Sequence, residues 1–298
     1  MNKEQFLKRD RLLRALSTDG LYRISIAKTT DIVRTAQKKH GLSLLGTVLL
    51  GRVLTGCLLL ASSLKGEERI QIKMEGSGPA GAVIAEATSN GEVRGYATRP
   101  DAELDFRDNR SLGDGIGAGV MTVTRILYNR ARPVSGTVAL VRGNVNEDLA
   151  HYLLQSEQIP SAVSLDVALD ENGDVSGAGG VLVQAMPDAV QDKTICLENN
   201  IRLMPQVGEQ LKNGYLDDIL STVANGLQVK ELTRYPVDFF CRCSRERFKR
   251  SLALVSPDEL LSLDNETEEL VCHFCSERYL FHREEIQAIA QKAKIRQN

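Results

Sequence analysis

Four of the six cysteines fall in two closely spaced pairs near the C-terminus. Cys241 and Cys243 form a C-x-C, and Cys272 and Cys275 form a C-x-x-C. Thiolates at such spacings are the ligands of a tetrahedral zinc site, because each pair supplies one edge of the tetrahedron. With Zn–S bonds of about 2.3 Å, the four sulfurs must converge to within about 4 Å of one another. The spacing therefore predicts a metal site bound by four sulfurs.

Other interpretations of these cysteines remain open at the level of the residues. Free cysteine is often a small core hydrophobe, and the thiols could also form permanent disulfides. His273 and His282 are close enough in sequence to compete as ligands, but four sulfurs already complete the tetrahedron. The first 17 residues contain no apolar signal region, so we expect a cytoplasmic protein. Thiols stay reduced there, which favours metal binding or redox sensing over structural disulfides.

Length and composition limit the partners of the chain. At 298 residues the chain is long enough for two domains. A net charge of −2 and an aromatic content of 5%, without tryptophan, argue against nucleic-acid binding. The most apolar window, 42–60, contains Arg52 and several glycines, so we interpret it as a buried helix and expect no membrane partner.

Residues 1–190 predict one α+β domain with a mainly antiparallel sheet and helices packed on it. Strict alternation of apolar and polar residues over 69–75 predicts a strand. The other predicted elements are a short helix at the N-terminus, helices over 30–41, 43–66 and 147–155, and strands over 21–27, 120–128, 136–141, 163–169 and 180–186.

A glycine-rich stretch follows the strand predicted at 69–75 and formally matches the G-x-G-x-x-G of dinucleotide-binding proteins. That motif must open a helix, but Pro79 and a turn at Asn90-Gly91 predict a hairpin instead. We therefore expect no nucleotide cofactor. His40 and His151 are isolated, and no catalytic triad is visible, so we do not expect an enzyme.

The remainder of the chain predicts two further segments. Residues 191–240 form amphipathic helices interrupted at Asn213-Gly214, and their apolar side must lie on the first domain. Residues 241–298 form a small domain, with a helix after the capping residue Ser256, a strand near 279–281 and a C-terminal helix. This domain contains ten basic and ten acidic residues, so it lacks the basic surface of a nucleic-acid-binding zinc ribbon.

The sequence resembles the heat shock protein 33 family. The resemblance rests on C-x-C-S-R-E-R, on C-H-F-C-S-E-R-Y-L-F and, upstream, on GSGPAGAVIAEATSNGEVRGYA, QSEQIPSAVSLDV and GGVLVQAMPDA. It implies one zinc ion per reduced chain, bound by Cys241, Cys243, Cys272 and Cys275. It also implies disulfides Cys241–Cys243 and Cys272–Cys275 in the oxidised chain, which loses its zinc. Cys57 and Cys196 match no motif of the family, and we expect them only to pack.

The resemblance further implies a redox-regulated holdase chaperone that works without ATP and binds unfolding or oxidatively damaged proteins. Residues 1–190 would be the substrate-binding and dimerisation domain, 191–240 the linker and 241–298 the redox switch. Apolar surface exposed by oxidation favours self-association, so we expect an oxidised homodimer. The main alternative is a thiol–disulfide oxidoreductase that uses Cys272 and Cys275. Such a motif normally lies at a helix N-terminus, whereas this one lies between strand-like residues.

Overall fold

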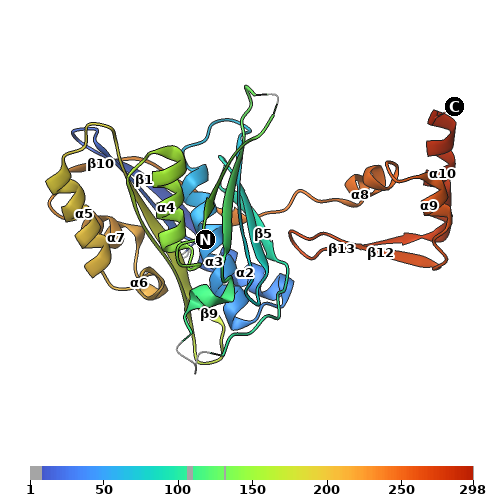
Figure 1. Cartoon of the computed structure of the whole chain (residues 1–298), viewed down its shortest axis with the longest axis horizontal. Helices are drawn as coiled ribbons and strands as arrows, with labels where there is room; N and C mark the ends of the chain where they lie inside the picture. Colours follow the sequence, from blue (N-terminus) through green and yellow to red (C-terminus); the bar gives the residue numbers. More distant parts are fainter. Residues whose placement is uncertain (1–8, 106–109, 131, 298) are drawn as a thin grey trace. The chain divides into compact units, whose positions relative to one another are not determined.

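The computed structural model of the chain describes residues 9–105, 110–130 and 132–297. The chain forms two compact units, 1–240 and 241–298 (Figure 1). Each unit combines helices with strands that pair antiparallel, except for one short parallel pair in the first unit. The predicted α+β class with mainly antiparallel sheets is therefore confirmed.

The first unit contains a five-stranded sheet, here called sheet A. The two faces of this sheet are both apolar, because alternate residues along each strand enter two different cores. Leu12 and Leu182 belong to one core, whereas Leu13, Ile24 and Val183 belong to the other. In spatial order its strands are β10 (Val229–Pro236), β1 (Arg11–Ser17), β2 (Tyr22–Lys28), β9 (Val175–Ala185) and β8 (Ser161–Leu169).

A second sheet of six strands, sheet B, completes the first unit. Only one of its faces is apolar, and Ile70, Ile72 and Met74 are fully buried there. Gly91, with φ of 85°, forms the predicted turn between β4 and β5, so the glycine-rich stretch before β4 opens no helix. In spatial order its strands are β11 (Asp238–Phe239), β5 (Glu92–Ala97), β4 (Ala82–Thr88), β3 (Arg69–Gly76), β6 (Gly119–Ile126) and β7 (Val134–Ala139).

Helix α3 (Leu44–Ala61) lies between the two sheets and contacts strands of both (Figure 1). It begins as predicted, with the Ser43 hydroxyl accepting from the Gly46 N–H, but it ends at Ala61 rather than at residue 66. The helix is long and apolar enough to cross a membrane, yet 83% of it is buried inside the unit. Because it contacts protein on both sides, this apolar composition is that of a core helix. Helices α2 (Thr30–His40) and α4 (Asn146–Glu157) lie beside it.

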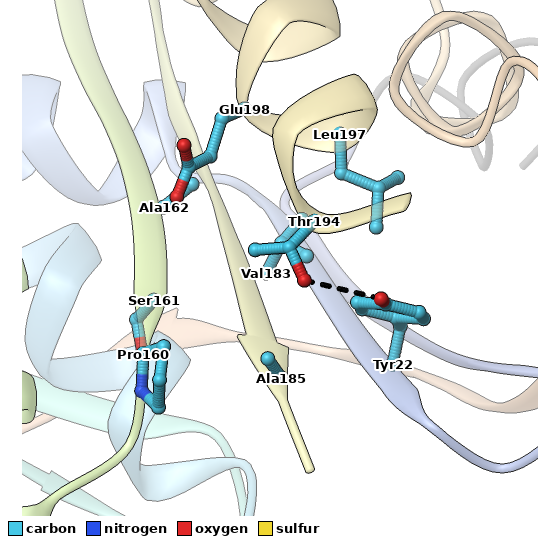
Figure 2. A pocket seen from close by; sticks show the side chains of 9 residues that line it. All are labelled: Tyr22, Pro160, Ser161, Ala162, Val183, Ala185, Thr194, Leu197 and Glu198. Carbon is cyan, nitrogen blue, oxygen red and sulfur yellow. Dashed lines mark hydrogen bonds between the residues drawn. The ribbon is translucent and has the colours of Figure 1, made fainter. Parts of the chain in front are cut away.

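The other face of sheet A is covered by three short helices, α5 (Gln191–Leu203), α6 (Val207–Asn213) and α7 (Leu216–Val223). Figure 2 shows how α5 meets the sheet. The Tyr22 hydroxyl donates to the Val190 carbonyl over 2.7 Å and lies 3.1 Å from the Thr194 hydroxyl, beside a small pocket. At the far end of the sheet, the Arg234 guanidinium donates to both carboxylate oxygens of Asp217 in α7, at 2.6 and 2.9 Å.

Two expectations for this unit are wrong. The predicted N-terminal helix falls partly on residues 1–8, which lie outside the described residues, and partly on β1. Pairing with β2 and β10 buries both faces of Leu12–Leu13, which overrides the helix preference of a leucine-rich segment. The segment 191–240 is also not helical throughout, because 229–236 forms strand β10 at the edge of sheet A.

The second unit is small. The fully or nearly fully buried part of its core consists of Leu260, Phe281, Ile286, Ile289 and Ala290 among the described residues. In its first helix, which contains Arg245, Arg247, Lys249 and Arg250, the Arg245 guanidinium stacks on the Phe281 ring at 4.5 Å and donates to both carboxylate oxygens of Glu285. Its elements are α8 (Arg245–Leu252), α9 (Pro257–Leu261), β12 (Thr267–Val271), β13 (Arg278–His282) and α10 (Arg283–Gln297).

Candidate metal centre

The four predicted ligands come from two places in the second unit. Cys241 and Cys243 lie between strand β11 and helix α8. The Ser244 hydroxyl accepts from the Arg247 N–H at the start of α8, so the C-x-C ends where this helix begins. Cys272 and Cys275 lie in the turn of the β12–β13 hairpin. The two motifs are thus held by separate elements that the fold brings together.

The turn that carries the C-x-x-C is tightly hydrogen-bonded. The carbonyl of Cys272 accepts from the N–H groups of Cys275 and Ser276, at 3.3 and 2.8 Å. The N–H of Cys272 donates to the Glu277 carbonyl. Ser276 has a left-handed backbone with φ of 56°, which reverses the chain within few residues. As a result, both sulfurs project to the same side of the turn, where the C-x-C lies.

The four sulfur atoms lie within 4.8 Å of one another. Two close separations join the two motifs, with 3.7 Å between the Cys241 and Cys272 sulfurs and 3.3 Å between those of Cys243 and Cys275. These distances are too long for a disulfide, whose S–S bond is about 2.05 Å, and none of the four cysteines forms one. Four sulfurs at the corners of a tetrahedron with 2.3 Å metal bonds lie about 3.8 Å apart. The cluster therefore fits a tetrahedral metal ion.

The surroundings of Cys272 and Cys275 make these two thiols weak acids. Cys272 and Cys275 are buried, whereas Cys241 and Cys243 are half-buried. Burial raises the pKa of both buried thiols above its ordinary value of 9.0, so they stay protonated at neutral pH when no cation is near. A divalent cation must displace these protons to bind, and metal binding at this site should release protons.

One side chain outside the motifs contacts the cluster. The Tyr279 hydroxyl donates to the Cys243 sulfur over 3.2 Å, and this contact raises the pKa of the tyrosine. The Tyr279 ring lies 4.9 Å from the ring of Phe248 in α8. The sequence predicts Tyr279 only as a strand residue, because nothing in its spacing from the cysteines shows that β13 directs it toward Cys243.

The other candidate residues lie apart from the cluster. The sulfur of Cys57 is fully buried in α3 and donates weakly to the carbonyls of Ile70 and Ala85, as a packing residue would. Cys196 is exposed on α5. His273 and His282 are exposed, and neither joins the metal-ligating group found among the described residues.

The oxidoreductase alternative requires a C-x-x-C that begins a helix. Cys272 and Cys275 lie instead between two strands, and each has a sulfur of the other motif within 4 Å. A pair shared in this way suits metal ligation better than thiol–disulfide exchange with a substrate.

Comparisons with known proteins agree with this arrangement. Residues 10–282 match the family model of the Hsp33 protein. The chain is 40% identical to a 33 kDa chaperonin of Desulforamulus reducens, over 95% of this chain and 98% of the relative. It is 33% identical to the 33 kDa chaperonin of Bacillus subtilis, over 94% and 98% of the two chains.

A solved structure extends the comparison to the fold. The crystal structure of the 33 kDa chaperonin, a heat shock protein 33 homologue, from Thermotoga maritima matches with a TM-score of 0.88 and 33% identity. The match covers 97% of this chain and 99% of that one. Both the family model and these relatives span nearly the whole chain, and the chain therefore belongs to the Hsp33 family.

Proposed function

We propose that this protein is a cytoplasmic, ATP-independent holdase chaperone that is inactive when reduced and activated by oxidation of its four clustered cysteines. Membership of a family whose relatives are named chaperonins supports the chaperone function. The observation that carries the regulation is the convergence of four free sulfurs within 4.8 Å in a unit with a small core.

In the reduced protein, Cys241, Cys243, Cys272 and Cys275 would hold one Zn²⁺. Bound Zn²⁺ would supply the positive charge that keeps all four sulfurs ionised, against the burial that raises the pKa of Cys272 and Cys275. The four residues then join the α8 side of the unit to the β12–β13 hairpin. A structural zinc site contributes about 10–16 kcal/mol to folding, which a core of this size lacks.

A peroxide supplies the oxidising equivalents. One thiolate attacks a peroxide oxygen and breaks the O–O bond, which gives a sulfenic acid and releases hydroxide. A second thiolate attacks the sulfenic sulfur, forms the S–S bond and displaces another hydroxide. Each disulfide thus transfers two electrons from the thiolates to one peroxide, so the four cysteines consume two peroxides. Disulfide sulfurs carry no negative charge and no longer serve as metal ligands.

We assign the disulfides to Cys241–Cys243 and Cys272–Cys275. The assignment is supported by the resemblance to the Hsp33 family and by the short spacing within each motif, and all four sulfurs lie within 4.8 Å of one another. Pairing within each motif leaves no bond between the two motifs once the metal is lost, which couples disulfide formation to loss of structure in 241–298. Disulfides between the motifs would instead keep α8 linked to the hairpin.

Unfolding of 241–298 would loosen the segment 191–240 that precedes it. Helices α5–α7 cover an apolar face of sheet A that includes Leu13, Ile24 and Val183. Their release would expose two complementary apolar surfaces, one on the helices and one on the sheet. Apolar contact is non-directional, so such surfaces can bind many unfolding clients, and they can also pair two oxidised chains as a homodimer.

The decisive experiment measures zinc content and suppression of client aggregation before and after peroxide treatment. We expect one zinc per reduced chain, zinc release on oxidation, and suppression of aggregation without ATP only after oxidation. A double variant, Cys272→Ser with Cys275→Ser, should lack zinc and suppress aggregation even when reduced. Cys196→Ser removes an exposed thiol outside the cluster and should behave as the wild type does.

Two results would contradict the proposal. Equal suppression of aggregation by reduced and oxidised wild type would exclude regulation by these cysteines. A double variant that is inactive under every redox condition would exclude unfolding of 241–298 as the switch. Peptide mapping of the oxidised protein distinguishes disulfides within the motifs from disulfides between them.

A further inference from the structure

The sulfurs of the cluster differ in the hydrogen bonds that they accept from outside it. Cys272 accepts from the backbone N–H of Phe274, and Cys275 accepts from the backbone N–H of Glu277. Cys243 accepts from a side chain, the hydroxyl of Tyr279, over 3.2 Å. Backbone donors persist under any substitution that keeps the turn, whereas the donor to Cys243 depends on a single oxygen atom.

Two elements hold this hydroxyl in place. Tyr279 lies in β13, opposite Leu270 in the antiparallel pair with β12. Its ring packs against Phe248 of α8 at 4.9 Å between centroids, with the planes tilted by 36°. The hydroxyl is therefore presented to Cys243 by a strand on one side and a helix on the other, and it needs little reorganisation to donate.

We propose that Tyr279 is a positioning residue of the cysteine cluster, whose hydroxyl holds the Cys243 sulfur in place for metal binding and slows its oxidation. The proposal deepens the function proposed above and rests on it for the role of oxidation. Hydrogen bonds to charged groups are stronger than those between neutral groups, so this contact would be strongest when Cys243 binds a metal ion.

The same bond opposes reaction with peroxide. Attack requires a sulfur lone pair to form the new S–O bond while the O–O bond breaks and hydroxide leaves. A donor on the sulfur withdraws electron density from that lone pair and occupies one approach to it. Removal of the hydroxyl should therefore weaken metal binding and accelerate formation of the sulfenic acid at Cys243.

Tyr279→Phe tests this proposal with the loss of one oxygen, because the ring and its packing on Phe248 remain. Competition with a chromophoric zinc chelator under anaerobic conditions measures zinc affinity, which we expect to fall by about 10-fold, at the low end of the 10–100-fold typical of outer-shell changes. Timed peroxide exposure followed by isotope-coded alkylation measures the oxidation of each cysteine. Cleavage after Arg242 places Cys241 and Cys243 on different peptides. We expect the rate at Cys243 to rise relative to Cys275.

Phe248→Leu is the matched control, since it removes the ring contact and leaves the hydroxyl. It should lower the thermal stability of the second unit while changing the Cys243 to Cys275 rate ratio less than Tyr279→Phe does. Unchanged zinc affinity and an unchanged rate ratio in a folded Tyr279→Phe protein would overturn the proposal. Equal effects of the two variants would also overturn it, because packing would then explain both.

The zinc affinity and the oxidation rates that test Tyr279 can be measured without any assay of chaperone activity. If the wild type binds zinc through four sulfurs but never becomes a holdase, the proposed function fails, yet the affinity and the rate ratio still decide the role of Tyr279. If the wild type becomes a holdase on oxidation and Tyr279→Phe matches it in both readouts, only the role of Tyr279 fails.

Discussion

The two units of this chain are stabilised in different ways. In the first, helix α3 is enclosed by two sheets, and Leu50, Leu54 and Leu58 along it are at most 1% exposed. In the second, the buried core has only four large side chains among the described residues, Leu260, Phe281, Ile286 and Ile289. At about 2 kcal/mol for each, these four contribute about 8 kcal/mol, which is less than a structural zinc site supplies. If zinc occupies the site as proposed, we therefore expect a chemical change at the four sulfur atoms to unfold the second unit and leave the first folded.

Removal of metal should give the largest difference between the units. We expect a chelator to remove the protection of backbone amides in the second unit against hydrogen exchange, because about 10–16 kcal/mol of folding free energy would be lost. Hydrogen exchange at Leu260 and Phe281 should rise to the unfolded rate, while exchange at Ile72 and Leu182 stays slow. Restoring zinc should reverse the change. Slow hydrogen exchange at Phe281 in the metal-free protein would show that the second unit does not depend on metal for its fold.

A core truncation should affect the first unit by an intermediate amount. Leu54→Ala removes a fully buried side chain of α3 and should lower the free energy of unfolding by about 2–5 kcal/mol. Denaturant unfolding with and without chelator checks this, and the loss should be the same in both conditions. Leu260→Ala is the counterpart in the second unit, and its effect should appear only when zinc is bound. A chelator-dependent effect of Leu54→Ala would show that the units do not fold separately.

A smaller effect is expected where α7 contacts sheet A. Arg234 lowers the pKa of Asp217 below its ordinary value of 3.8, so the folded state favours the charged carboxylate. This contribution is complete above pH 3.8 and is lost as the pH falls through the lowered pKa. Because Asp217 is 59% exposed, the pair contributes no more than about 1 kcal/mol.

Asp217→Asn removes this charge with little change in size. Hydrogen exchange over 216–223 should be faster than in the wild type at pH 7, and the difference between the two proteins should shrink in acid. Glu209→Gln changes a carboxylate in α6 whose ion pair is with Lys212 of the same helix, and it serves as the control. A difference between Asp217→Asn and wild type that is constant with pH would show that Arg234 does not act through charge.

The smallest effect should come from the hairpin turn of the second unit. Ser276 has a left-handed backbone, which costs an L-residue about 1 kcal/mol relative to glycine. Ser276→Gly should therefore relieve about 0.5–1 kcal/mol of strain in the zinc-bound unit. Part of this gain is offset, because glycine gives the unfolded chain more conformational entropy. Thermal unfolding of the zinc-loaded protein measures this, with Ser262→Gly at the right-handed end of α9 as the control that should destabilise.

Much of the first unit could be predicted from the sequence because its signals are local. Alternation over 69–75 indicates β3, and Asn90-Gly91 forms the turn between β4 and β5 whatever the neighbouring strands are. Strand β1 could not be predicted in this way. Its apolar residues face two cores at once, so they lack the period of two that reveals a strand with one buried face.

The candidate metal centre could likewise be predicted only in part from the sequence. Two cysteine pairs at C-x-C and C-x-x-C spacing determine by themselves that four thiols can converge, because each pair already brings two sulfurs together. The tertiary structure alone decides that Cys243 lies beside the Tyr279 hydroxyl and that Phe248 supports the tyrosine ring. These contacts join residues 31 or more positions apart, or link a helix to a strand, and no local pattern encodes the way two elements pack.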